Sequence, residues 1–315
     1  MIVKIEKAIS KLFEKIYGAE MIEFEHPIIF KYVSGEDHHI ESIKDNYFYL
    51  SRLWQVNDPE DCTINPTIDL ANTTYQEIEN FLLRNSPSGD HSSLKQYALK
   101  LFNDKGAQRE YIKELEKINI ALDEEYKKSF KILCLTDNYR SKHMWKNYAK
   151  KKKKLDGFCL GYKCESKSSV SFVREHKKYK IRIKLGSIEV KGNPQDSLLA
   201  YEVFYGDEDL IAYNPFKNNV NILLSSYLYK KEKWSSEKEF RTLITDDQTI
   251  KPDLQKIRYI EEDLKYIIFG ENHSIKDRNA VLKAIHENGR YGNIKFYEAS
   301  LIFCKLRFKE IKHFA

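Results

Sequence analysis

The chain has 315 residues, of which 42% are hydrophobic and 32% charged, and its formal net charge is +6 at pH 7. This composition is typical of a folded globular protein and argues against an intrinsically disordered chain. No apolar run approaches the roughly 20 residues of a membrane span, so we expect no contact with a membrane. The mild positive charge permits binding of nucleic acid, nucleotide or phosphate but does not require it.

The cysteines and the N-terminal segment both indicate a cytoplasmic protein. The five cysteines are odd in number and form no C-x-x-C pair, which favours reduced thiols. Residues 1–20 have the apolar spacing of an amphipathic helix that stops at Gly18, and they lack the uninterrupted apolar core of a signal peptide. We expect this helix to cap the fold or to bind a partner.

The first half of the chain predicts two strands followed by helices. Strands are expected at 27–33, which carries the charged residue Lys31, and at 47–51, and a turn is expected at 56–61. Helical periodicity covers most of residues 73–129, broken at 85–90 and 104–106. We therefore predict a helical insertion at about 73–129 within one domain that spans 21–315.

The second half predicts mostly strands. A buried strand is expected at 130–136, and a helix capped by Ser141 at 143–153. The five lysines at 150–154 are typical of a solvated helix end, with phosphate attraction as the alternative. Further strands are expected at 157–162, 179–190, 199–205, 240–245, 264–269 and 294–303, and a helix from Ser274 to Gly289. The fold class is α+β, with a single mixed, mainly antiparallel β core.

Residues 233–242 contain the most distinctive charged pattern. Glu237, Glu239 and Arg241 are spaced two apart, so their side chains share one face if the strand begins early. Together with Trp234 they predict either a salt-bridged edge strand or a polar site. The sequence contains no G-x-G-x-x-G, phosphate-loop, H-E-x-x-H or G-x-S-x-G motif, and its histidines do not have a zinc-binding spacing. We expect neither a metal site nor a covalent nucleophile.

Several stretches together resemble a known family. They are Phe30-Lys31-Tyr32, Asn57-Asp58-Pro59, Met144-Trp145-x-x-Tyr148-Ala149 leading into residues 157–161, Lys230-x-x-x-Trp234-x-x-Glu237-x-Glu239-x-Arg241, and Phe269-Gly270. The family is bacterial and phage-borne, carries a domain of unknown function, and includes AbiG-type abortive phage-infection proteins. The family often has His before the glycine at 157, where this chain has Asp156.

The order of these stretches also looks like that of ADP-ribosyltransferases, whose sheet is split. This resemblance implies a defence or toxin-type transferase that uses NAD as substrate and modifies protein or nucleic acid. A carboxylate that faces the ribosyl cation lowers the barrier to loss of nicotinamide. Under this resemblance the assigned roles are Glu239 at the ribosyl cation, Glu237 at the acceptor, Lys31 at the diphosphate, Tyr148 or Trp145 against nicotinamide, and Arg241 bracing Glu239. Tyr32 is a further residue expected to bind the cofactor.

Three other interpretations remain open at this point. Lys31 and Glu239 could form a buried ion pair, and Trp145 and Trp234 could be core aromatics, all without a catalytic role. A non-catalytic defence component could bind nucleic acid or a partner through Lys150–Lys154. A nuclease could use Glu237, Glu239 and Lys230. The acceptor, the trigger and the oligomeric state are not predicted.

Overall fold

The computed structural model describes residues 14–312 except for gaps at 57, 59–60, 63–69, 71, 87–88, 167, 172–176, 191–192, 207–213, 218–226 and 246–254. The first half of the chain contains β1 (Ile28–Val33), α2 (Asp37–Lys44), β2 (Tyr47–Tyr49), β3 (Ser51–Arg52), the 3-10 helix η1 (Leu53–Gln55), α3 (Tyr75–Asn85), α4 (His91–Asn103), α5 (Lys105–Ser129), β4 (Phe130–Thr136) and α6 (Lys142–Asn147). The second half contains β5 (Phe158–Lys163), β6 (Ser168–Ser171), β7 (Lys177–Val190), β8 (Asn193–Glu202), β9 (Phe204–Gly206), η2 (Pro215–Lys217), β10 (Tyr229–Lys231), η3 (Glu232–Glu237), β11 (Glu239–Thr245), β12 (Lys256–Arg258), η4 (Glu261–Asp263), β13 (Leu264–Gly270), α8 (Ile275–Asn288), β14 (Lys295–Ile302) and β15 (Lys305–Glu310).

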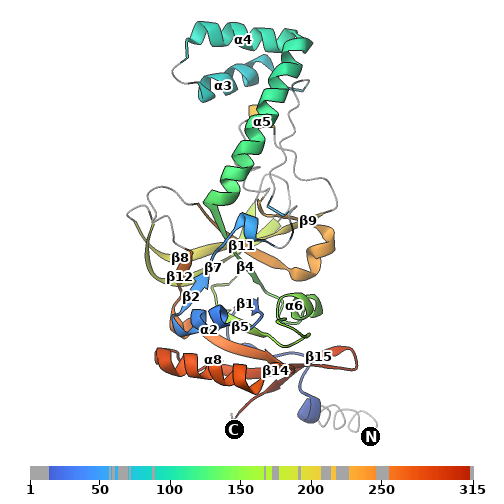
Figure 1. The fold of residues 1–315 in the computed structure, drawn as a ribbon, viewed down its shortest axis with the longest axis vertical. Coiled ribbons are helices and arrows are strands. Elements are labelled where there is room, and N and C mark those ends of the chain that lie inside the picture. The colour runs from blue at the N-terminus through green and yellow to red at the C-terminus, as the bar shows by residue number, and fades with distance from the viewer. Residues whose placement is uncertain are drawn as a thin grey trace.

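A large central sheet organises the molecule (Figure 1). Its strand order is β15-β14-β13-β5-β1-β4-β11-β8-β7-β6, and β3 also pairs with β4. Among the described pairs of this sheet, β13 and β14 run parallel, and the others run antiparallel. The predicted α+β class with a mixed, mainly antiparallel sheet is therefore confirmed.

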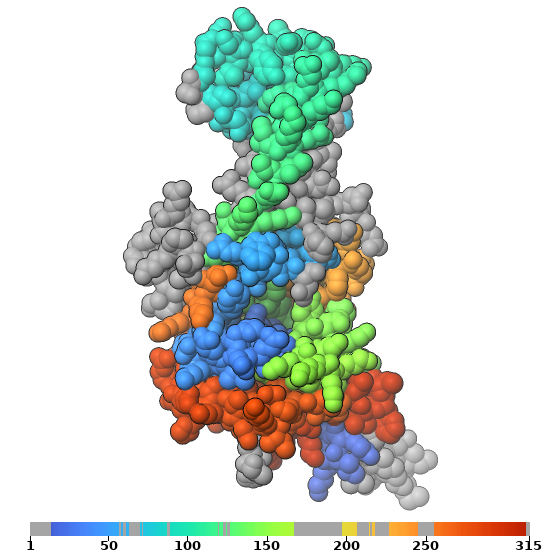
Figure 2. Space-filling model, viewed as in Figure 1, coloured from blue at the N-terminus to red at the C-terminus, as the bar shows by residue number. Residues whose placement is uncertain are grey.

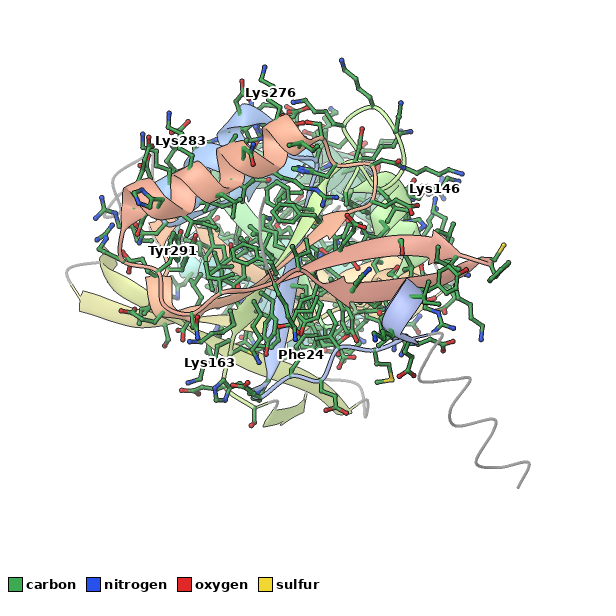
Figure 3. The ribbon with its side chains drawn as sticks, turned by 90° about the horizontal axis from the view of Figure 1, so that it is seen from below. Phe24, Lys146, Lys163, Lys276, Lys283 and Tyr291 are labelled. Carbon is green, nitrogen blue, oxygen red and sulfur yellow. The ribbon has the colours of Figure 1, made fainter. Side chains whose placement is uncertain are left out.

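The two faces of the sheet bury different side chains. Because side chains alternate along a strand, Ile29 and Val33 of β1 join the core beneath α2 and α8, whereas Phe30 and Tyr32 join the core beside α6. The exposed face of α8 carries Lys276 and Lys283, which point away from the sheet (Figure 3). Lys31 therefore extends toward the α2 side of the sheet.

Strands β1 and β4 lie side by side but diverge almost at once. Every residue of β1 from Ile28 to Val33 pairs with β5, but the described pairing between β1 and β4 is limited to Phe30 with Thr136. On its other part, β4 pairs with β3 at Ile132. The residues that would continue the β1–β4 ladder, 31–33 and 133–135, thus face each other across an opening in the middle of the sheet.

The helical insertion projects from the sheet (Figure 1). The 25-residue helix α5 leads back into β4, and α3 and α4 pack against its far part. These helices share a small apolar core that includes Ile78, Ala98 and Leu101, and Phe216 of η2 packs into it. Thr74 begins α3 with a capping box to Glu77, which satisfies backbone donors at that helix end. Among the described residues, no helix has the length and apolar character of a membrane span.

The lysine-rich segment differs from its prediction. The helix expected at 143–153 ends at Asn147, and the exposed lysines at 150–154 lie in a loop. The carboxylate of Asp156 accepts hydrogen bonds from the backbone N–H groups of Lys151, Lys152 and Lys153 at 2.6–2.7 Å. These three N–H groups are therefore satisfied by a side chain and not by the backbone carbonyls of a helix. We call residues 150–154 the lysine loop.

The N-terminal helix lies mostly outside the described residues, which begin at 14. Residues 14–17 are helical, and Gly18 follows with φ of +85°. A Cβ at this glycine would lie 2.6 Å from the carbonyl oxygen of Phe308, so the chain passes close to β15 here.

Candidate functional site

A cavity of about 420 Å³ occupies the opening between β1 and β4. Its walls include Lys31 and Tyr32 from β1, Cys134 from β4, Tyr148 from the end of α6, and Glu239 from β11. Figure 2 shows this face hollowed between the blue atoms of α2 and β3 and the green atoms of α6. The divergence of two central strands therefore creates a site in the middle of the fold, where charged side chains from distant parts of the chain meet.

Arg241 is the most enclosed charged group of the site. It is 0% exposed, and its guanidinium binds two carboxylates at once. Nε and Nη2 donate to Glu239 at 2.8 and 2.9 Å, while Nη1 and Nη2 donate to Asp61 at 2.8 and 2.6 Å. Nη1 also donates to the carbonyl oxygen of Tyr227 at 2.9 Å. All of these bonds are charge-assisted or satisfy a buried donor, so Arg241 locks Asp61 and Glu239 in place.

Lys230 joins the same cluster from β10. Its ammonium lies 2.6 Å from Glu237, 3.2 Å from Glu239 and 3.5 Å from Asp61. Burial alone would lower the pKa of Lys230, but the three carboxylates raise it above its usual value. Three carboxylates against two cations leave the cluster of Asp61, Lys230, Glu237, Glu239 and Arg241 with one net negative charge.

Glu239 is held as an ionised carboxylate by two cations. Burial acts to raise its pKa, but Arg241 and Lys230 outweigh that effect and hold the pKa of Glu239 at about 2. Arg241 donates to both of its oxygens, and Lys230 donates once more to Oε2. A carboxylate accepts about four hydrogen bonds, so two cations fill most of the acceptor positions of Glu239.

Glu237 has different surroundings. Its Oε1 accepts a hydrogen bond from the Tyr148 hydroxyl at 2.8 Å and lies 3.4 Å from Nε2 of His143, while Oε2 accepts from Lys230. Burial and the neighbouring Glu237 raise the pKa of Tyr148, so this phenol stays protonated and donates. His143 is 28% exposed in its side chain, which connects Glu237 with solvent at one side. Glu237 therefore has the capacity to accept a further hydrogen bond.

A left-handed residue separates the two glutamates. The prediction that Glu237, Glu239 and Arg241 share one strand face is wrong for Glu237, because β11 begins at Glu239. Glu237 ends the 3-10 helix η3, and Lys238 then turns the chain with φ of +46°. The hydroxyl of Thr136 donates to the carbonyl oxygen of Glu237 at 2.6 Å and fixes this turn against β4.

Lys31 extends into the cavity without a partner. Within the part of the chain that the structure describes, its ammonium forms no hydrogen bond or ion pair. The ion pair with Glu239, which the sequence left open as an alternative, does not form, and Glu239 pairs with Lys230 and Arg241 instead. Burial lowers the pKa of Lys31, and the charge of Glu239 opposes that shift only in part. A half-buried cation that no described residue pairs with is a ready position for an anionic ligand group.

The aromatic residues divide between the cavity and the core. The prediction that Trp145 contacts a cofactor is wrong, because this residue is 1% exposed, does not line the cavity, and donates from Nε1 to the carbonyl oxygen of Tyr139 at 2.9 Å. Trp234 does line the cavity and donates to Asp58 at 2.8 Å. Tyr32 and Tyr148 also line it, and the Tyr32 hydroxyl donates to the carbonyl oxygen of Asn138.

Three parts of the site were missed by sequence reasoning. Asp61 was expected only as part of a turn, although it forms a bidentate pair with Arg241. Lys230 was considered only for a nuclease, and His39 was not considered for this site, although both line the cavity. The available signals were weak: Lys230 lies seven residues before Glu237, and Asp61 shares its turn with Asp58.

Comparison of the chain with protein-family models, curated proteins and solved structures found no match.

Proposed function

We propose that the cavity between β1 and β4 is the active site of an NAD-dependent ADP-ribosyltransferase that modifies protein or nucleic acid. The observation that carries this proposal is one cavity lined by a carboxylate pair, by the Lys31 ammonium, which no described residue pairs with, and by the aromatic rings of Tyr148 and Trp234. A cytoplasmic effector of phage defence or of the toxin type is the setting that the sequence resemblance implies.

The reaction needs charge opposite a ribosyl cation. The bond between C1′ of the ribose and the nicotinamide nitrogen breaks, and nicotinamide leaves with the bonding electron pair. The net negative cluster around Glu237 and Glu239 stabilises the positive charge that develops on the ribose. The acceptor nucleophile then forms a bond to C1′ and passes its proton to Glu237. No metal ion or further co-reactant enters this balance.

The surroundings of the two glutamates divide their roles. Three hydrogen bonds from Arg241 and Lys230 hold Glu239, so its contribution is fixed negative charge. Glu237 keeps acceptor capacity, so it takes the hydrogen bond from a ribose hydroxyl or from the acceptor. Arg241 has no exposed atom and supports Glu239 without touching substrate.

Labelled NAD incubated with purified protein and with lysate from infected and uninfected cells tests the proposal. We expect transfer of label by the wild type and at least about a 100-fold loss in Glu237→Gln. The matched control is Glu232→Gln, an exposed residue in the same 3-10 helix, which should keep full activity. Absence of label transfer by the wild type would reject the transferase, and equal transfer by wild type and Glu237→Gln would reject the role of Glu237.

A second candidate function is binding of nucleic acid without catalysis. It is favoured by the exposed lysine loop, whose first residue, Lys150, also lines the cavity. Segment 140–154 contains eight basic residues and no acidic one. Phosphate contacts make affinity fall as the salt concentration rises. The slope of the logarithm of the binding constant against the logarithm of the salt concentration changes by about one for each contact.

Replacing Lys151, Lys152 and Lys153 together by Gln should then lower the salt slope of oligonucleotide binding by about 3. The control replaces Lys276 and Lys283, exposed lysines on α8 that point away from the sheet (Figure 3). A salt slope that stays the same in the loop variant would reject this second function.

A further inference from the structure

A second cavity of about 490 Å³ adjoins the first. The two cavities share four lining residues, Lys31, Val33, His39 and Ser51. The first cavity extends from this shared wall toward the glutamates, and the second extends beneath α2 toward β2. Each volume lies in the range of about 300–1,000 Å³ that is usual for ligand cavities. The shape is thus two chambers of similar size that meet at Lys31.

We propose that the two cavities bind the two halves of one dinucleotide, with its diphosphate at Lys31 and its adenosine half in the second cavity. This inference rests on the proposed function and specifies how its substrate is placed: the nicotinamide riboside half would occupy the first cavity, beside Glu237.

The shared wall has the chemistry of a phosphate position. Lys31 supplies an ammonium that no described residue pairs with. His39 beside it is neutral at pH 7, because burial, His38 and Lys31 lower the pKa of His39 to about 3. A neutral imidazole can donate one hydrogen bond to a phosphate oxygen without adding a charge. An anionic linker at this point would give Lys31 the partner that it lacks.

The second cavity has the chemistry of a site for a flat heterocycle. Its walls include the aromatic residues Tyr47, Phe48, Tyr49 and Tyr162. Tyr49 is 37% exposed, so part of its ring is open to a ligand. Aromatic side chains stack on nucleobases with a gain of about 1–3 kcal/mol per base. At the rim, Lys256 and Glu41 form an ion pair at 2.9 Å beside Ser42, which offers polar groups to ribose hydroxyls.

Binding of half-ligands to the intact protein tests the placement, using ADP and nicotinamide mononucleotide in calorimetric titrations. Ser42→Phe places a ring in the second cavity and should weaken ADP binding at least about tenfold, with nicotinamide mononucleotide unchanged within about twofold. Asn147→Trp narrows the first cavity from α6 and should have the opposite effect. Lys31→Met should weaken both ligands, because each places a phosphate at the shared wall.

Equal ADP affinity in wild type and Ser42→Phe would overturn the placement, as would no ADP binding by the wild type. An equal loss of ADP and nicotinamide mononucleotide affinity in Ser42→Phe would overturn it too, because both ligands would then occupy one cavity. The proposed reaction is judged separately, by label transfer in wild type and Glu237→Gln. The binding experiment can therefore reject the adenosine position without rejecting the transferase. Conversely, ADP can bind as expected in a protein that transfers no label. Unchanged melting temperatures of the three variants confirm that each one is folded.

Discussion

Arg241 binds Glu239 through two hydrogen bonds, Nε to Oε1 at 2.8 Å and Nη2 to Oε2 at 2.9 Å, although the two residues lie only two positions apart on β11. The same guanidinium binds Asp61, which lies 180 positions away in sequence. Removal of one partner from a buried ion pair leaves a buried charge uncompensated. Arg241 therefore supports both the fold and the candidate site.

Arg241→Leu should lower the free energy of unfolding by about 3–5 kcal/mol, because Glu239 and Asp61 would both lose their main cation. Urea denaturation followed by circular dichroism measures this change. The exposed Arg140 is the control, and Arg140→Leu should change stability by less than about 0.5 kcal/mol. If the two variants unfold at the same urea concentration, the buried network is not stabilising.

The Glu239 carboxylate should make stability depend on acid pH. Its folded pKa of about 2 lies below the unfolded value of 4.5, so its contribution is complete above pH 4.5 and is lost as pH falls toward 2. Urea midpoints measured from pH 5 to pH 2 should fall more steeply in the wild type than in Glu239→Gln. Parallel profiles would mean that Glu239 has an ordinary pKa in the folded protein.

His39 and His273 should make the stability of the fold depend on pH in a higher range than Glu239 does. Burial is the main cause that lowers the pKa of His39 to about 3 and that of His273 to about 4, from 6.5 in the unfolded chain. Because the unfolded chain then binds more protons, stability is complete above pH 6.5 and falls as pH decreases below it. Between pH 6.5 and 5 the wild type should lose stability, and His273→Gln should lose less over the same range. An identical loss in both proteins would contradict the neutral, buried His273.

Asp156 should control the order of the lysine loop. Asp156→Ala removes the acceptor of three backbone N–H groups, so the loop should open more often and trypsin should cleave within 150–154 several times faster. Asp156→Asn keeps one acceptor oxygen and should give an intermediate rate. Cleavage at wild-type rates in Asp156→Ala would show that these hydrogen bonds do not hold the loop.

Lys238 should tolerate glycine better than any branched residue. At φ of +46°, glycine has no Cβ penalty, so Lys238→Gly should raise the free energy of unfolding by about 0.5–1 kcal/mol. Lys238→Val should lower it by about 1–2 kcal/mol, because a β-branched side chain is strained there. Urea denaturation distinguishes the two signs, and a neutral valine would mean that the turn relaxes to another conformation.

Elements with strong local signals could be predicted from the sequence. The apolar runs of β1, β4 and β13 gave strands within a residue or two of their bounds, since continuous apolar segments of this length suit buried strands. Helix α8 begins after Ser274, whose side chain caps it, and ends at Gly289 with φ of +67°. Both ends follow from single residues with well-defined backbone preferences.

The parts that failed depend on contacts between distant residues. The helix at 143–153 was extended too far because the spacing of its residues does not show that Asp156 accepts the N–H groups of the lysine loop. The prediction placed Trp145 at the cavity because the helical pattern does not show whether a residue of α6 faces the cavity or the core. Asp61 was missed since its partner, Arg241, lies on a strand at the other end of the chain. Each of these contacts forms only when the chain is folded.

The divergence of β1 from β4 also has a thermodynamic consequence. Two central strands form only part of their mutual ladder, so backbone groups of β1 and β4 beside the opening are not paired with each other. A molecule that bridges this opening would complete the sheet as well as fill a hollow, and its binding free energy would add directly to the cohesion of the fold. A ligand of this cavity should therefore raise the melting temperature, so a thermal shift assay would detect its binding before any reaction is measured.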